Sequence, residues 1–243
     1  MAGVGSRAMK RIRNRGNRML VNSPMISLPP ELVTEVLARV ASSSATDLFT
    51  AKLSCKVFSQ IAEESYVYKR VSLDKFPVVA WHHRRQIAAF FNKCKCSKNP
   101  EALYRQGVVD FFGGEELNSA IECLKEAMES GHEGASYAMA IILIFFGGDM
   151  KQKGITYLKG MKKSRNLEGR IGYCRESLRR IIRRIWVKNP LVLNERPKCC
   201  TMQHEKHKGW TRYQFDRDDN TCEACKCDEE IAYICDALPQ III

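Results

Sequence analysis

The stretch FFGGEELNSAIECLKEAMESGHEGASYAMAIILIFFGG, residues 111–148, begins and ends with the same four residues. The two copies of Phe-Phe-Gly-Gly are 34 positions apart, and Ile121 and Leu124 of the first unit align with Ile155 and Leu158 of the second. A period of 34 residues is typical of repeats that consist of two antiparallel helices. The sequence therefore predicts an all-α protein with a short helical-repeat array at its centre.

Each unit of this array is predicted to be a helix that ends at a glycine pair, followed by a second helix. Glycine ends a helix readily because it adopts the left-handed backbone at no steric cost. Two units are fewer than the roughly three that a stable stack needs, so neighbouring helices should complete the array. The predicted helices are 100–112 and 117–129, then 135–146 and 151–163.

Segments on both sides of the repeats can supply those neighbours. Residues 78–93 could cover the front, and 165–188 could cover the rear, where apolar residues recur at steps of three and four until Asn189-Pro190 ends the helix. We interpret the arginines of the rear helix as a solvated basic face, with a nucleic acid or membrane surface as the alternative. The apolar positions are Leu167, Ile171, Cys174, Leu178, Ile181 and Ile185, and the arginines are Arg170, Arg175, Arg179, Arg180, Arg183 and Arg184.

Residues 28–73, LPPELVTEVLARVASSSATDLFTAKLSCKVFSQIAEESYVYKRVSL, predict three short helices. Pro29 and Pro30 suit a helix start, because the N–H groups that they lack would be unsatisfied there anyway. Thr46 is the expected N-cap of the second helix, and the third should cover about 55–64. A unit this small buries only part of its apolar surface, so a second polypeptide should cover the rest.

The order of proline, apolar and aromatic positions in this segment resembles the F-box. The similarity is clearest in LPPEL (28–32) and LSCKVF (53–58), although many F-boxes have tryptophan where Phe58 and Tyr68 stand here. The resemblance implies a surface for a Skp-family adaptor, which would join the chain to a cullin. The residues implied to face the adaptor are Leu28, Pro29, Glu31, Leu32, Val36, Leu37, Val40, Leu48, Leu53, Cys55 and Phe58.

The wider chain resembles a family of plant F-box proteins with Sel-type tetratricopeptide-like (TPR-like) repeats. NPEALYRQG (99–107) and ECLKEAMESGHEGASYAMA (122–140) are similar to such repeats. The resemblance implies the substrate-receptor subunit of a Skp-cullin-F-box (SCF) E3 ubiquitin ligase, which binds its adaptor through 28–73 and a target protein through the repeat region, 74–190. Such a subunit is not an enzyme and requires no cofactor.

The sequence motifs also favour a protein that is not an enzyme. The chain has no phosphate-binding glycine-rich loop, no His-Glu-x-x-His and no Gly-x-Ser-x-Gly. The alternative function is a basic helical-repeat scaffold that binds nucleic acid or an acidic protein without any ligase. A steep salt dependence of binding would favour that alternative.

Residues 191–243 form a tail rich in cysteine and histidine. Cys222 and Cys225 have Cys-x-x-Cys spacing, and Cys200-x-x-x-His204 precedes them. Thiolate and imidazole groups are the donors of tetrahedral zinc sites, and a tail with few aliphatic residues gains folding energy from a metal. We therefore predict a structural zinc site, with reduced, unligated cysteines as the alternative. The predicted ligands are Cys200, His204, Cys222 and Cys225, while Cys199, Cys227 and Cys235 remain open as substitutes.

Charge and composition suggest where the chain acts. Of the net charge of +12, a large part lies in 151–198, and residues 1–27 carry six Lys or Arg and no acid. We expect 1–27 to be a disordered basic tail, with a nuclear import patch or a mitochondrial presequence as alternatives. No run approaches the roughly 20 apolar residues of a membrane span, and 1–27 lacks the apolar core of a secretory signal. Eleven cysteines then indicate reduced thiols or metal ligands in the nucleus or cytoplasm.

Overall fold

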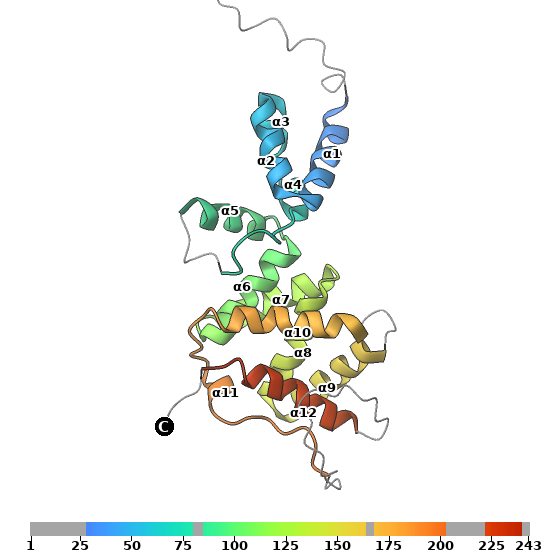
Figure 1. Ribbon diagram of the computed structural model, residues 1–243, viewed down its shortest axis with the longest axis vertical. Coiled ribbons are helices and arrows are strands. Elements are labelled where there is room, and N and C mark those ends of the chain that lie inside the picture. Colours follow the sequence, from blue (N-terminus) through green and yellow to red (C-terminus); the bar gives the residue numbers. More distant parts are fainter. Residues whose placement is uncertain (1–27, 80–84, 164–167, 203–221, 240–243) are drawn as a thin grey trace, which may run out of the picture.

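The computed structural model describes residues 28–79, 85–163, 168–202 and 222–239, and these segments form twelve α-helices and no strand. The prediction of an all-α fold is confirmed. Figure 1 shows the helices as an elongated stack, with the first four at one end and the last two at the other. Within the described segments no helix is long and apolar enough to cross a membrane. The predicted basic tail, 1–27, lies outside them.

The segment that resembles the F-box contains four helices rather than the three that its sequence predicts. The first begins at Pro30, as the two prolines predict. The second begins two residues early because Ser44, and not Thr46, is its N-cap: the Ser44 hydroxyl accepts a hydrogen bond from the backbone N–H of Asp47 at 3.2 Å. The third helix ends at Ile61 instead of the predicted 64, and a turn then leads to a fourth helix that the sequence did not predict. The four helices are α1 (Pro30–Ser43), α2 (Ala45–Ser54), α3 (Lys56–Ile61) and α4 (Ser65–Arg70).

These four helices do not close their own hydrophobic core. Leu37 and Leu48 lie at its centre, and each is no more than 2% exposed. Phe91 of α5 (Arg85–Cys96) and Ala102 of the following helix belong to the same cluster of buried side chains. The F-box segment is therefore completed on its inner side by later parts of the same chain.

Two helix pairs form the predicted repeat array. Their ends agree with the predicted ends to within three residues. The glycine pairs explain this agreement, because Gly114 and Gly147 both have φ of +75° and end the first helix of each pair. The pairs are α6 (Pro100–Gly113) with α7 (Leu117–Glu129), and α8 (Glu133–Phe146) with α9 (Gly148–Lys163).

The rear of the array is formed by α10 (Glu168–Ile182). Its predicted apolar positions are buried in the core of the repeats, apart from Leu167, which lies outside the described residues. The helix ends at Ile182, before the predicted 188. The chain turns there, and the Asn189 side chain donates a hydrogen bond to the Phe111 carbonyl at 2.7 Å, which ties the turn to the end of α6.

The C-terminal helix packs on the repeats. A separate tail is expected from residue 191, but α12 (Glu223–Cys235) places Cys227, Ile231 and Ile234 in the same core cluster as α6 to α10. In the sequence, the short α11 (Pro190–Leu193) lies between α10 and α12. Helix α12 packs on the repeats because it has an apolar stripe, and two repeats alone would leave an apolar face uncovered.

Helix packing in this array depends on glycine at the points of closest approach. A Cβ atom on Gly154 of α9 would lie 2.6 Å from the Ala140 carbonyl oxygen and 2.8 Å from Cγ1 of Ile144, both on α8. Real Cβ atoms do not come this close to a backbone oxygen, so a larger residue would push α8 and α9 apart.

We predict that Gly154→Ala lowers the free energy of unfolding by about 1–3 kcal/mol, because the added methyl group overpacks the helix pair. Gly160→Ala on the same helix is the matched control, since no heavy atom lies within 4 Å of its Cβ position. Alanine there should be neutral or stabilising, by up to about 1 kcal/mol. Urea denaturation of both variants checks this, and equal stabilities would contradict the close approach.

Candidate functional site

Exposed aliphatic side chains lie on α1, α2 and α3. Leu32 is 52% exposed and Leu53 is 88% exposed, although both lie on helices that share a buried core. Leu28 and Val36 are also exposed, and so is Val57 of α3, at 38%. We call these five residues, Leu28, Leu32, Val36, Leu53 and Val57, the adaptor face.

The structure divides the residues that the F-box resemblance implies. Leu37 and Leu48 are buried and hold the helices together, so their side chains are not available to another chain. Val57 was missed by the sequence reasoning, and its distance of four residues from Leu53 is no helical signal, because the extended Cys55 separates α2 from α3. The exposed members are Leu28, Pro29, Glu31, Leu32, Val36 and Leu53, and the half-buried ones are Val40, Cys55 and Phe58.

Charged groups tie α5 to the F-box helices. The Glu63 carboxylate binds Lys52 of α2 and, at 2.7 Å, Lys93 of α5, and it accepts a hydrogen bond from the Tyr68 hydroxyl at 3.0 Å. Burial alone would raise the pKa of Glu63, but the two lysines and Tyr68 lower it to about 2. The carboxylate is therefore charged at any physiological pH, and the tie persists.

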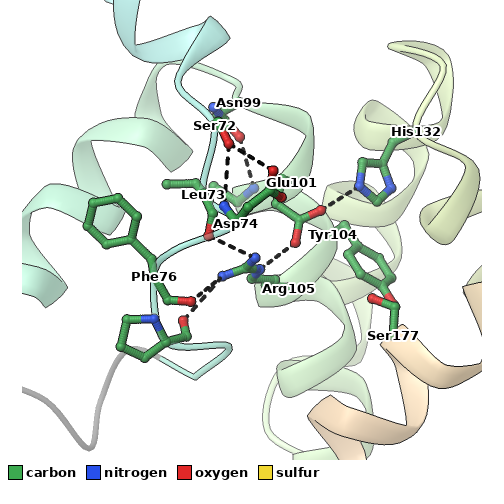
Figure 2. A network of polar contacts seen from close by, with 12 residues as sticks. Ser72, Leu73, Asp74, Phe76, Asn99, Glu101, Tyr104, Arg105, His132 and Ser177 are labelled. Atoms are coloured by element: carbon green, nitrogen blue, oxygen red, sulfur yellow. Dashed lines mark hydrogen bonds and ion pairs between the residues drawn. The ribbon is translucent and has the colours of Figure 1, made fainter. Parts of the chain in front are cut away.

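The junction between the F-box helices and the repeats lies at the start of α6, and Figure 2 shows its polar contacts. The Asn99 side chain caps α6 by accepting from the Ala102 N–H at 3.1 Å. Its amide nitrogen donates to the carbonyls of Tyr68 and Val71 at 3.0 and 2.9 Å. Asn99 is 2% exposed, so these carbonyls are paired with no help from bulk water.

Six residues after Asn99, Arg105 holds the rest of the segment that leaves α4. Its guanidinium donates to the carbonyls of Leu73, Phe76 and Pro77 at 3.1, 3.4 and 3.2 Å. Arg105 is 4% exposed, and the Glu101 carboxylate balances its charge. The exit segment of the F-box is thus bonded to α6 along its length (Figure 2).

The same network continues into the other repeat helices. His132 caps α8, because its Nδ1 accepts from the Ala135 N–H at 3.0 Å, which leaves Nε2 to donate to Glu101 at 2.7 Å. The Tyr104 ring stacks on His132 at 4.7 Å between centroids, and its hydroxyl bonds to Ser177 of α10 at 3.4 Å. Burial raises the pKa of Glu101, but His132 and Arg105 outweigh this effect and lower it. The junction therefore links α4, α6, α8 and α10.

A buried carboxylate fixes α12 on the repeats. Glu230 is 3% exposed, and it accepts from the Tyr137 hydroxyl at 2.8 Å and from Nε and Nη2 of Arg175 at 2.8 and 2.7 Å. Burial, and then the charge of Glu230, raise the pKa of Tyr137 well above its ordinary value. Arg175 also lies 4.4 Å from the ring centroid of Tyr233. The prediction that Arg175 belongs to a solvated basic face is wrong, because its partner comes from a helix far along the chain.

Three of the four predicted metal ligands come together at the start of α12. The sulfur atoms of Cys200, Cys222 and Cys225 lie within 4.8 Å of one another, and those of Cys200 and Cys222 are 3.6 Å apart. We call these three residues the thiol triad. It is the only such group of possible metal ligands in the part of the chain that the structure describes, and three sulfurs at these distances could hold a metal ion. The fourth predicted ligand, His204, lies outside that part.

The neighbouring cysteines have other roles. Cys227 is buried in the core, and Cys235 is half-buried at the far end of α12. The backbone N–H groups of Cys199 and Cys200 donate to the Asp228 carboxylate at 2.6 and 3.0 Å. Asp228 therefore holds the segment that carries Cys200 beside the first turn of α12.

Similarity to known proteins agrees with this architecture. Residues 73–183 match the family model described as plant tetratrico peptide repeats. The chain is 36% identical over 137 residues to At1g67623 of Arabidopsis thaliana, a protein named provisionally as an F-box protein, and the match covers 56% of this chain and 46% of that protein. It is 26% identical over 140 residues to the F-box protein At2g35280 of the same plant, covering 58% of this chain and 84% of that one. The chain is therefore similar to plant F-box proteins, and its residues 73–183 match plant tetratricopeptide repeats. No solved structure matches it.

The predicted resemblance to plant F-box proteins with a tetratricopeptide repeat region is thereby confirmed. F-box proteins are in general adaptors without catalytic activity, which agrees with a prediction of no enzyme. The match spans less than half of the length of At1g67623.

We predict that Asn99→Asp destabilises the junction by about 2–4 kcal/mol, because the variant keeps the helix cap but loses both donors and buries a charge against two carbonyls. Asn118→Asp makes the same chemical change at an exposed position in the first turn of α7, where a negative charge is favourable, and should not destabilise the protein. Urea denaturation and limited proteolysis of 71–79 measure the effect. Unchanged stability of Asn99→Asp would mean that these hydrogen bonds do not hold the F-box in place.

Proposed function

We propose that this protein is the substrate-receptor subunit of an SCF E3 ubiquitin ligase. Its adaptor face binds a Skp-family adaptor and thereby a cullin, and its repeat region binds a target protein, in the nucleus or cytoplasm. The observation that carries the proposal is the exposure of Leu32 and Leu53 within a segment that resembles the F-box. Covering these apolar side chains favours association, because it removes apolar surface from water.

The proposed role needs no catalytic group in this chain. A receptor accelerates ubiquitin transfer by holding its target near a charged ubiquitin carrier, which raises the effective concentration of the reacting groups. That effect requires a fixed distance between the adaptor face and the target. Asn99 and Arg105 supply the fixed junction, since both are buried and bonded to the chain that leaves α4.

A structural zinc ion is the second part of the proposal. The thiol triad supplies three sulfur donors, and the sequence motif supplies His204 as the fourth. Thiolate-rich sites of this kind favour zinc over the hard cations magnesium and calcium, which prefer oxygen ligands. When bound, zinc would supply folding energy and no reaction chemistry.

One surface of the repeats favours the alternative of a basic scaffold. Trp186 is 84% exposed just beyond the end of α10, and Tyr173 is 70% exposed on that helix. Arg180, Arg183 and Arg184 are exposed nearby in the sequence. Aromatic rings among arginines are typical of surfaces that bind nucleic acid or an acidic protein.

We predict that Leu32→Asp and Leu53→Asp each weaken binding of a Skp-family adaptor at least tenfold, about 1.4 kcal/mol, because each buries a charge in an apolar interface. Met150→Asp is the matched control: the side chain is 44% exposed, but it lies on α9. Co-expression with the adaptor followed by affinity capture measures binding, and circular dichroism verifies that each variant folds.

Two results of this experiment would contradict the proposal. One is full adaptor recovery by Leu32→Asp and Leu53→Asp. The other is no adaptor recovery by the unmodified chain together with nucleic acid binding that weakens steeply as salt rises, which would favour the basic scaffold.

A further inference from the structure

We infer that a zinc ion in the thiol triad and the docking of α12 on the repeats stabilise each other, so that metal loading decides whether the C-terminal helix closes the repeat array. This inference rests on the proposed metal site and is independent of adaptor binding. The role of the ion is then to keep a covering helix in place.

Docking of α12 matters because it covers the end of an incomplete array. Ile231 and Ile234 are fully buried, and they lie in one cluster with the apolar side chains of α8, α9 and α10. The helix contacts both α9 and α10. If α12 undocked, these apolar side chains would become exposed to water, and the two-repeat array would lose the helix that completes it.

The docking of α12 depends on its contacts with the rest of the chain. An isolated helix of 13 residues is marginal in water, so α12 depends on its surroundings. Its strongest polar contact is the Glu230 pair with Arg175, and a buried ion pair returns little net stability because both charges lose their hydration. A further contribution would add to the apolar contacts of Ile231 and Ile234 in holding the helix.

The thiol triad is placed to give that contribution. Cys222 is the N-cap of α12, its sulfur accepts from the Cys225 N–H at 3.3 Å, and Cys200 comes from the segment that precedes the helix. Two sulfur ligands of a tetrahedral zinc ion at about 2.3 Å lie about 3.8 Å apart, close to the 3.6 Å between Cys200 and Cys222. A disulfide would need the two sulfur atoms about 2.05 Å apart, so Cys200 and Cys222 are not joined by one.

Asp228 makes this geometry depend on α12 itself. Its carboxylate accepts hydrogen bonds from the N–H groups of Cys199 and Cys200. The sulfur of Cys200 is therefore held near those of Cys222 and Cys225 only when α12 is folded. A metal that joins Cys200 to Cys222 also closes the chain between them, which lowers the entropy of the undocked state as a cross-link does. Metal affinity and docking are therefore coupled in both directions.

The coupling should not reach the F-box. Figure 1 shows α12 at the opposite end of the stack from α1 to α4. The junction lies at the start of α6, and its hydrogen bonds involve Asn99, Arg105 and the segment that leaves α4. Metal loss is expected to loosen the C-terminal end while adaptor binding continues.

Hydrogen exchange of the full chain, purified with zinc and then treated with a chelator, tests the inference. We expect one zinc per chain, and a loss of amide protection of at least tenfold in α12 after chelation, with α1 to α4 unchanged. Cys222→Ser with Cys225→Ser should reproduce chelation. Cys96→Ser, an exposed cysteine of α5, should retain both the metal and the protection.

Glu230→Gln separates coupling from simple metal binding, because it weakens docking and leaves every thiol in place. It should lower the affinity for cobalt(II), followed by thiolate-to-metal absorption, at least fivefold, since coupling acts equally on both partners. Unchanged affinity in Glu230→Gln, or full α12 protection in the chelated protein, would overturn the inference while the metal site stands. A chain that retains no zinc would overturn both, and adaptor capture in parallel would show whether the proposed ligase function survives.

Discussion

The architecture depends on two buried side chains at the start of α6 that pair with main-chain carbonyls. Asn99 and Arg105 donate to the carbonyls of the segment that leaves α4, and both are almost inaccessible to water. A buried carbonyl without a donor costs about 1–3 kcal/mol, so the F-box helices cannot swing away from α6 without a large loss of stability. Phe91 and Ala102 add an apolar contact at the same place. The F-box is therefore a fixed end of the helical stack.

This arrangement separates the buried apolar side chains of the F-box segment from the exposed ones. Helices α5 and α6 cover the inner side, where Leu37 and Leu48 lie. Leu32 and Leu53 lie outside that core, and they stay 52% and 88% exposed. The unit is completed by its own chain on one side and is expected to be completed by an adaptor on the other.

The sequence predicted the repeat helices well because the Phe-Phe-Gly-Gly copies mark the ends of helices directly. It could not separate the two sides of α1, because Leu32 and Val36 outside and Val33 and Leu37 inside form one broad apolar stripe. The thiol triad followed from local spacing. The role of Arg175 could not be predicted from local spacing, because Glu230 is 55 residues away and only the packing of α12 brings the two side chains together.

The central claim is that α1 to α3 present their exposed apolar side chains to an adaptor. A photo-activated cross-linker at position 53 tests it most directly, because this side chain has the greatest exposure among the large apolar residues described. In the presence of a Skp-family adaptor, we expect covalent capture of the adaptor from position 53 and none from position 150 on α9. Capture from position 150 alone, or from neither position, would contradict the account.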